Sequence, residues 1–241
     1  PNYFFQHVQQ ENSAMNLDKS AVTREAYFPT LVYTYQESQA EPLNRRLLGL
    51  IHDEQDRDKA GIQRSNFSKL GGWHSHNNLY KDPAYDDLTN RIHAAAALVS
   101  SDLGYHRNFA LRIGTMWSII NAPGSSNRAH IHPGCDWSGV YYIQVPEGCG
   151  NIEFVDPRTE NLMFQPRYVP NRKRPKPCWT KVNVTPKAGK MLIFPSWLYH
   201  SVAPNLSDAQ GRAGERVIVS FNLTQQRLPA VKAAPQTEAA A

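Results

Sequence analysis

Two histidines stand two residues apart in the stretch "RAHIHPG", just before a run of residues typical of a β-strand. Side chains at positions i and i+2 of a strand point to the same face, so we expect His130 and His132 to project together. A third histidine, His200, lies in a later strand-like stretch, "FPSWLYHSVAP". Imidazole is the commonest metal ligand near neutral pH, and three protein ligands with further positions open are typical of a catalytic metal centre. The three histidines therefore form a candidate metal site.

Two other histidines, His74 and His76 in "GGWHSHNN", also make a pair. We favour them less, because the Gly- and Asn-rich surroundings are typical of a loop. A single histidine in a strand is usually a hydrogen-bonded structural residue. A pair at i and i+2 with a third histidine on a later strand is harder to explain in that way.

The elements that must position these side chains change in type along the chain. Residues 27–36 are rich in β-formers and predict a strand, whereas 42–55 and 85–101 have the apolar spacing of amphipathic helices. From Asn108 onward, eight short β-like runs are separated by Gly, Pro, Asn and Asp. This pattern predicts a mainly β fold with flanking α-helices, either a sandwich or a jelly roll.

We expect one domain over residues 27–226. Its first part, 27–107, would pack a strand and helices on the barrel, and 108–226 would form the β core. Residues 1–26 are predicted to be a loosely ordered segment and 227–241 a disordered tail.

The composition narrows the class of protein. The chain has 241 residues and three cysteines, which form neither a disulfide framework nor a CxxC metal site. No apolar run is long enough to span a bilayer, and the first residues are too polar for a signal peptide. These features predict a soluble, cytoplasmic protein without a membrane partner.

The net charge is +5, and the basic residues are unevenly distributed. The segment 167–181 holds several of them and no acid. It is interpreted either as a solvated loop or as a rim that attracts an anionic substrate. Because no recognised nucleic-acid motif accompanies it, we do not expect a nucleic-acid partner.

Several motifs in order resemble the iron(II)- and 2-oxoglutarate-dependent oxygenases. The closest likeness is to a bacterial and phage-associated branch of the prolyl-hydroxylase-like group, and it covers roughly residues 28–224. The motifs "GGWHS", "HxHP", "SGVYY", "DPR", "FPSWLxHxV" and "RxxxSFN" stand at residues 71–75, 130–133, 138–142, 156–158, 194–202 and 216–222.

The resemblance implies a double-stranded β-helix with iron(II) at its open end. It also implies 2-oxoglutarate as cosubstrate, dioxygen, and hydroxylation of a small molecule, amino acid or peptide with release of succinate and CO2. Arg216 would bind the far carboxylate, since a guanidinium pairs with it in two places and keeps its charge. The other residues implied are Ser220, Tyr142 and Asn121 at the cosubstrate, and Trp117 and Asn222 in the substrate pocket. For Tyr142 and Trp117, the alternative role is packing in the hydrophobic core.

The sequence departs from the family pattern at one position. The usual ligands are two histidines and one carboxylate, but the second position here is His132. The interpretation that we favour is that three histidines bind iron. Alternatively, His132 lies outside the coordination shell and water replaces it, or Asp136 folds back as the carboxylate. The rival functions are a three-histidine dioxygenase that needs no 2-oxoglutarate, and a non-enzymatic binding barrel.

Overall fold

The structure is a computed structural model that describes residues 23–61, 72–163 and 166–229. The chain divides into two units, residues 1–30 and 31–241. The described part of the first unit, 23–30, contains no helix or strand. The predicted loose ends lie outside the described residues at 1–22 and 230–241. The last strand continues through Arg227, the first residue of the predicted tail.

The first strand is shorter than predicted. Instead of residues 27–36, β1 spans only Tyr33–Gln36 and pairs antiparallel with β8 (Lys190–Pro195). Phe28 has a φ of 57°, in the left-handed region, and Pro29 follows it without an N–H to donate. The ladder ends at the pair Tyr33–Ile193, close to the end of β8 at Pro195, so residues before Tyr33 have little of β8 left to pair with.

The two predicted helices are confirmed as α2 (Ala40–Arg57) and α3 (Asp86–Asp102). Each buries the apolar stripe that its spacing predicted, with Leu47 and Ile51 of α2 and Leu88 and Ile92 of α3 fully buried. Before α3, the carboxylate of Asp82 caps a short 3-10 turn by accepting from the N–H of Ala84 at 2.9 Å.

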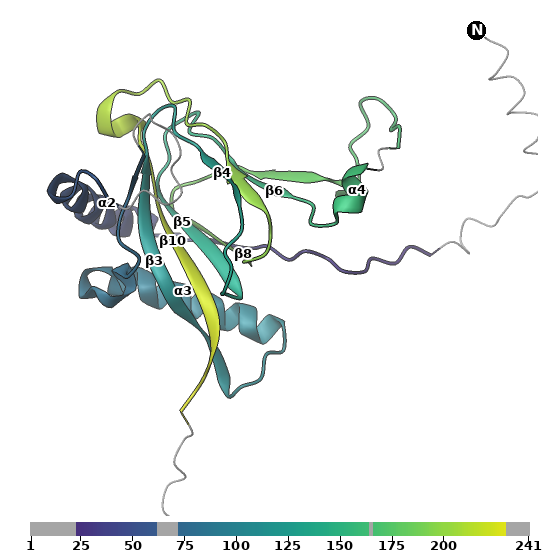
Figure 1. Cartoon of the computed structure of the whole chain (residues 1–241), viewed down its shortest axis with the longest axis horizontal. Helices are drawn as coiled ribbons and strands as arrows, with labels where there is room; N and C mark the ends of the chain where they lie inside the picture. Colours follow the sequence, from purple (N-terminus) through teal and green to yellow (C-terminus); the bar gives the residue numbers. More distant parts are fainter. Residues whose placement is uncertain (1–22, 62–71, 164–165, 230–241) are drawn as a thin grey trace, which may run out of the picture. The chain divides into compact units, whose positions relative to one another are not determined.

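The predicted mainly β fold is also confirmed, and it is a double-stranded β-helix. All eight predicted runs form strands, and from β3 to β10 successive strands alternate between two facing antiparallel sheets, except that β6 and β7 pair with each other in the smaller one (Figure 1). The larger sheet has the order β1-β8-β5-β10-β3-β2 and the smaller the order β4-β9-β6-β7. The bounds not yet given are β2 (Gly72–His74), β3 (Phe109–Asn121), β4 (Asn127–His130), β5 (Trp137–Gln144), β6 (Ile152–Val155), β7 (Lys181–Val184), β9 (His200–Val202) and β10 (Arg216–Arg227).

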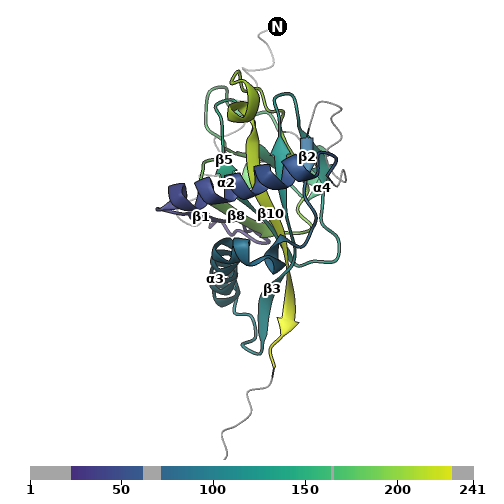
Figure 2. The ribbon, with the colours of Figure 1, turned by 90° about the vertical axis from the view of Figure 1, so that its left-hand side faces the viewer.

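The larger sheet carries one hydrophobic layer on each face. Its outer face buries side chains such as Tyr141, Val219 and Phe221 against α2 and α3. Figure 2 looks onto α2, which crosses in front of β5, β8 and β10. The inner face buries alternate residues, such as Val140 and Ile218, against the smaller sheet. The period-two alternation of each strand thus separates a structural core from the face that bears the candidate site.

The remaining described helical elements are short. None of the helices in the described ranges combines the length and the apolarity needed to cross a membrane. These elements are α4 (Thr159–Met163) and the 3-10 turns Leu79–Lys81, Pro83–Tyr85, Lys176–Cys178 and Gly211–Gly214.

Candidate metal and cosubstrate site

The three predicted histidines lie together on the smaller sheet. His130 ends β4 and His200 begins β9, and the two are directly paired across the antiparallel ladder. Their ring centroids are 4.4 Å apart, and those of His132 lie 5.0 Å from His130 and 5.2 Å from His200. The ligand nitrogens of all three lie within 4.8 Å of one another, close enough for one ion to join them.

The route by which His132 reaches this group differs from the prediction. The strand β4 ends at His130, so His132 does not lie on it. The chain turns after the strand, and the backbone N–H of His132 donates to the carbonyl of Ser196 at 2.9 Å. This bond to the β8–β9 connection, rather than strand alternation, holds the imidazole beside the other two.

Backbone carbonyls orient two of the imidazoles. Nδ1 of His130 lies 2.6 Å from the carbonyl oxygen of Arg128, and Nδ1 of His200 lies 2.8 Å from that of Leu198. A carbonyl can only accept, so each Nδ1 carries the proton and each Nε2 keeps its lone pair for a ligand. Such outer hydrogen bonds are typical of metal-binding histidines.

Burial keeps the imidazoles of His132 and His200 neutral. Burial, and then the neighbouring His130, lower the pKa of His132 from 6.5 to about 4 and that of His200 to about 3. A histidine must be deprotonated to bind a metal. His132 and His200 are therefore neutral and able to bind a metal throughout the physiological range of pH.

These shifts predict a pH-dependent stability. Because both folded-state pKa values lie below 6.5, the unfolded chain takes up protons first as the pH falls. The free energy of unfolding of the metal-free protein should then decrease between about pH 6.5 and pH 4, by up to about 1.4 kcal/mol per pH unit for each histidine. Urea unfolding at several pH values measures this slope. His200→Gln should lower this slope by the contribution of about one proton. An unchanged slope would contradict the lowered pKa of His200.

Asp136, the alternative carboxylate ligand, has another role in the structure. Its Oδ2 accepts a hydrogen bond from the backbone N–H of Gln225 at 2.6 Å, and its own N–H donates to Leu223 at 2.9 Å. It therefore fastens the β4–β5 turn to β10. It is not among the described residues whose ligand atoms cluster with the histidines.

A cavity of about 300 Å³ between the sheets includes the histidines. Eight of the nine predicted site residues line it, and Asn121 does not. Asn121 is fully buried and pairs with Arg216 across the β3–β10 ladder, so it lies beside the cavity wall rather than on it. The lining residues are His74, Asn77, Thr115, Trp117, Ile119, Asn127, His130, His132, Gly139, Val140, Tyr142, Ile152, Phe194, His200, Val202, Arg216, Ile218, Ser220 and Asn222.

Arg216 is the charged residue at one end of this cavity. Its side chain is 1% exposed, and its Nη1 donates to the backbone carbonyls of Cys149 and Ala203. Its Nε and Nη2 are buried without a hydrogen-bond partner, and no ion pair among the described residues involves it. Two unpaired donors of one guanidinium match the two oxygens of a carboxylate. Tyr142 interacts electrostatically with this charge. Burial raises the pKa of the Tyr142 hydroxyl, which therefore stays protonated and can donate a hydrogen bond.

Sequence comparison supports the same assignment. Residues 115–222, which include all nine predicted site residues, match the model of a protein family described as "Putative 2OG-Fe(II) oxygenase". The resemblance to 2OG-Fe(II) oxygenases is confirmed. None of the curated protein sequences compared matches the chain.

Solved structures of 2OG oxygenases share the fold of this oxygenase-like chain. A Pseudomonas putida prolyl-4-hydroxylase is 16% identical, with a TM-score of 0.53 over 83% of this chain and 94% of that one. The epimerase SnoN, in complex with Fe3+, alpha ketoglutarate and nogalamycin RO, is 14% identical, with a TM-score of 0.57 over 88% of each chain. A viral collagen prolyl hydroxylase from Paramecium Bursaria Chlorella virus-1, solved as a 2OG complex, is 14% identical, with a TM-score of 0.50 over 80% and 94%.

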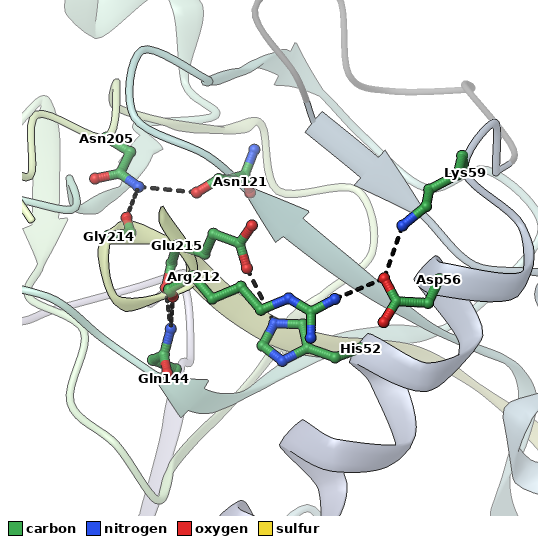
Figure 3. Close-up of polar contacts among 9 residues, drawn as sticks. All are labelled: His52, Asp56, Lys59, Asn121, Gln144, Asn205, Arg212, Gly214 and Glu215. Carbon is green, nitrogen blue, oxygen red and sulfur yellow. Dashed lines mark hydrogen bonds and ion pairs between the residues drawn. The ribbon is translucent and has the colours of Figure 1, made fainter. Parts of the chain in front are cut away.

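A polar cluster at the edge of the larger sheet fixes the start of β10 and thereby Arg216 (Figure 3). His52 on α2 contacts Glu215 at 2.9 Å, and Gln144 donates to the carbonyl of Glu215 at 2.8 Å. Nδ2 of Asn205 donates to the carbonyls of Asn121 and Gly214, both at 2.8 Å. Glu215, which precedes Arg216, is thus held by α2 and β5, and Asn121, the partner of Arg216 on β3, is held by Asn205.

Asn205 should be important for stability as well as for position. It is fully buried, and Asn205→Ala would leave the carbonyls of Asn121 and Gly214 without their side-chain donor. An unsatisfied buried group costs about 1–3 kcal/mol, so we expect a loss in the free energy of unfolding of at least that size. Urea unfolding measures it. The exposed Asp208→Ala in the same loop is the control, and equal effects of both changes would contradict this role.

His74, the less favoured candidate in the sequence, lies at the site. The segment "GGWHSHNN" was interpreted as a loop, but Gly72–His74 forms edge strand β2 along Ile119–Asn121. The His74 ring stacks on Trp117 at 5.7 Å and lines the cavity. The signal available was the motif "GGWHS" itself, but a three-residue strand specified by a distant partner has no periodicity to detect. His76 is half exposed and lies 3.4 Å from Glu54.

The basic segment has few contacts in the described structure. The Arg174 guanidinium lies over the Tyr168 ring at 4.3 Å, and the Trp179 indole donates to the Arg174 carbonyl at 3.0 Å. The segment leads into β7, and none of its residues lines the cavity.

Proposed function

We propose that the protein is a non-haem iron(II)- and 2-oxoglutarate-dependent dioxygenase that hydroxylates a C–H bond. The observation that supports this most strongly is a buried guanidinium with two unpaired donors in the same cavity as three clustered histidines. Burying an unpaired charge is costly, so a fold that keeps Arg216 there implies an anionic ligand.

The donor set fits iron(II). His130, His132 and His200 would hold the ion through imidazole nitrogens, which suit divalent iron, and three protein ligands leave positions for cosubstrate and dioxygen. When bound, iron(II) with 2-oxoglutarate and dioxygen supplies the oxidising power that converts a substrate C–H to C–OH, with release of succinate and CO2.

The larger sheet fits 2-oxoglutarate. Arg216, Ile218 and Ser220 alternate along the inner face of β10, so Arg216 and Ser220 are separated by roughly 13 Å of strand. Trp117 pairs with Ser220 and its ring lies 5.9 Å from that of His132, which places the histidines near the Ser220 end. A 2-oxo dicarboxylate bound at an ion held by the histidines would extend its far carboxylate toward Arg216. Tyr142 and Ser220 would add hydrogen bonds along its length.

The residues of this chain would then act by binding and orienting. The Arg216 fork fixes the far carboxylate, the Tyr142 hydroxyl remains protonated and donates, and carbonyl-anchored imidazoles keep their nitrogens directed at the ion. The apolar residues between them, such as Val140 and Ile218, limit the access of water to the reacting centre.

The three-histidine ligand set also favours a second candidate, a dioxygenase that does not need 2-oxoglutarate. A non-enzymatic binding barrel is the third reading of the fold. Succinate formation separates them. We expect iron-dependent release of succinate from 2-oxoglutarate. Oxidation of a substrate without 2-oxoglutarate would favour the three-histidine dioxygenase. The absence of turnover with any oxidisable compound would favour the binding barrel.

The substrate is proposed to be a small molecule, an amino acid or a peptide. One structural relative is named a prolyl-4-hydroxylase and another acts as an epimerase in nogalamycin biosynthesis. The fold is therefore compatible with both classes, and the choice rests on the cavity residues.

The basic segment is proposed to steer anions toward the site. Neutralising Arg172, Lys173 and Arg174 to Gln should raise the KM of the dianion 2-oxoglutarate by a few-fold at low salt. The effect should vanish as salt rises, because exposed charges are screened within about 10 Å at 0.1 M. The control neutralises the exposed Lys81 and Lys187. If the triple variant has the same KM as the wild type at low salt, the segment is a solvated loop with no steering role.

A further inference from the structure

The cavity has a second polar end, opposite Arg216, whose chemistry is different. Asn222 pairs with Thr115 on β3 and with Ser138 on β5, so the three side chains form one row across the inner face of the larger sheet. Asn222 lies six residues from Arg216 along β10, or roughly 20 Å. The ring of Phe194, which pairs with Ser138, lies 4.8 Å from that of His200, so this row is close to the histidines.

Hydrogen bonds fix the orientation of this row. The Ser138 hydroxyl donates to Oδ1 of Asn222 at 2.8 Å, and Nδ2 of Asn222 donates to Oγ1 of Thr115 at 3.1 Å. The amide is therefore held in one orientation. Thr115 keeps its hydroxyl proton as a donor, and Asn222 keeps one N–H and one acceptor lone pair. Both side chains line the cavity, so the row presents donors and acceptors together.

The indole of Trp117 adds a donor next to this row. Trp117 is 8% exposed and lines the cavity, and its Nε1–H is buried without a hydrogen-bond partner. Leaving such a donor unsatisfied is unfavourable, and buried Trp N–H groups usually find a partner. A ligand oxygen bound between Trp117 and Thr115 would satisfy it.

This end of the cavity has no charge to balance an ion. Among the described lining residues Arg216 is the only one besides histidine with a charged side chain, and it faces the opposite end. Within the proposed function, its partner is the cosubstrate. A carboxylate or an ammonium entering beside Asn222 would lose its hydration without gaining an oppositely charged side chain, and the charge of bound iron(II) would already be balanced by the 2-oxoglutarate dianion.

We propose, on the basis of the proposed function, that Thr115, Trp117 and Asn222 form a recognition site for an uncharged hydrogen-bonding group of the substrate, a carboxamide in particular. A carboxamide offers one acceptor for the Trp117 and Thr115 donors and one N–H for the free lone pair of Asn222. The part of the substrate that lies beside the iron is then neutral, whatever charge it carries elsewhere. Thr115 and Asn222 determine specificity rather than cosubstrate binding.

The test uses three probes of similar size: propionamide, propionate and propylammonium. Protein loaded anaerobically with iron(II) and excess 2-oxoglutarate is titrated with each, and paramagnetic relaxation of the probe's methyl protons reports binding beside the metal. We expect propionamide to bind roughly tenfold or more tightly than either charged probe. The isosteric Thr115→Val, which removes only the hydroxyl, and Asn222→Leu should abolish this preference.

Three results would overturn the proposal: equal or tighter binding of a charged probe, propionamide binding that is unchanged in Thr115→Val, or no relaxation of any probe. The methylene protons of 2-oxoglutarate are measured in the same samples. They should relax strongly in the wild type and in both variants. Absence of that signal in the wild type would instead contradict the proposed function, so the two failures are distinguishable.

Discussion

Replacing Arg216 with alanine is expected to raise the KM for 2-oxoglutarate by roughly thirty- to several-thousand-fold while iron(II) still binds. The removal of one partner of a buried charge pair typically costs about 2–5 kcal/mol, which corresponds to that range of affinity. Arg216 lies at the end of the cavity opposite the row of Asn222, and its unpaired Nε and Nη2 are the groups that would be lost. Steady-state succinate formation over a range of 2-oxoglutarate concentrations measures the effect.

Two further variants make this test specific. Arg216→Lys should recover only part of the affinity, because lysine keeps the charge but lacks the planar fork. Arg227→Ala, at the exposed far end of the same strand, should change the KM by less than about twofold. An unchanged KM in Arg216→Ala would remove the cosubstrate assignment, and the three-histidine dioxygenase would then be the better reading.

Substitution of His130 or His200 by alanine is expected to abolish stoichiometric iron(II) binding. The two side chains are paired across β4 and β9, and each is oriented by a backbone carbonyl. We therefore expect that no neighbouring side chain can take over as the metal ligand. Anaerobic equilibrium dialysis followed by metal analysis measures the occupancy. His106→Ala, a change to an exposed histidine before β3, is the control and should leave one iron per chain.

His132 distinguishes the alternatives for the third ligand. If it binds iron directly, His132→Ala should weaken iron binding strongly and His132→Asp, which restores the common two-histidine and carboxylate set, should recover it. If water occupies that position, both variants should bind iron as the wild type does. Full occupancy and turnover in His130→Ala and His200→Ala would contradict the metal site altogether.

The sequence predicted the inner face of the larger sheet well, because long strands have a regular alternation. Parity along β10 placed Arg216, Ser220 and Asn222 on one face, and all three line the cavity. Parity along β3 placed Asn121 on the same face, where it pairs with Arg216, but at this end of the strand Asn121 lies beyond the cavity lining. Alternation identifies a face, but the depth of a cavity along that face depends on the opposite sheet.

Short elements were harder to predict. His132 reaches the other histidines through a turn held by Ser196, and His74 lies on a three-residue strand that depends on β3. In both cases a hydrogen bond to a residue distant in the sequence determines the position, and local periodicity contains no trace of it. The short β1 has a similar cause, since its pairing stops near the end of β8 although the composition of residues 27–36 favoured a longer strand.

The most direct test of the central claim is an anaerobic titration of the iron(II)-loaded protein with 2-oxoglutarate, followed in the visible spectrum. Chelation of the metal by the 2-oxo acid produces a weak charge-transfer band. We expect the band to appear and to saturate at one 2-oxoglutarate per iron, with Arg216→Ala requiring far more cosubstrate to reach the same intensity. A protein that binds one iron but develops no such band at any 2-oxoglutarate concentration would contradict the account.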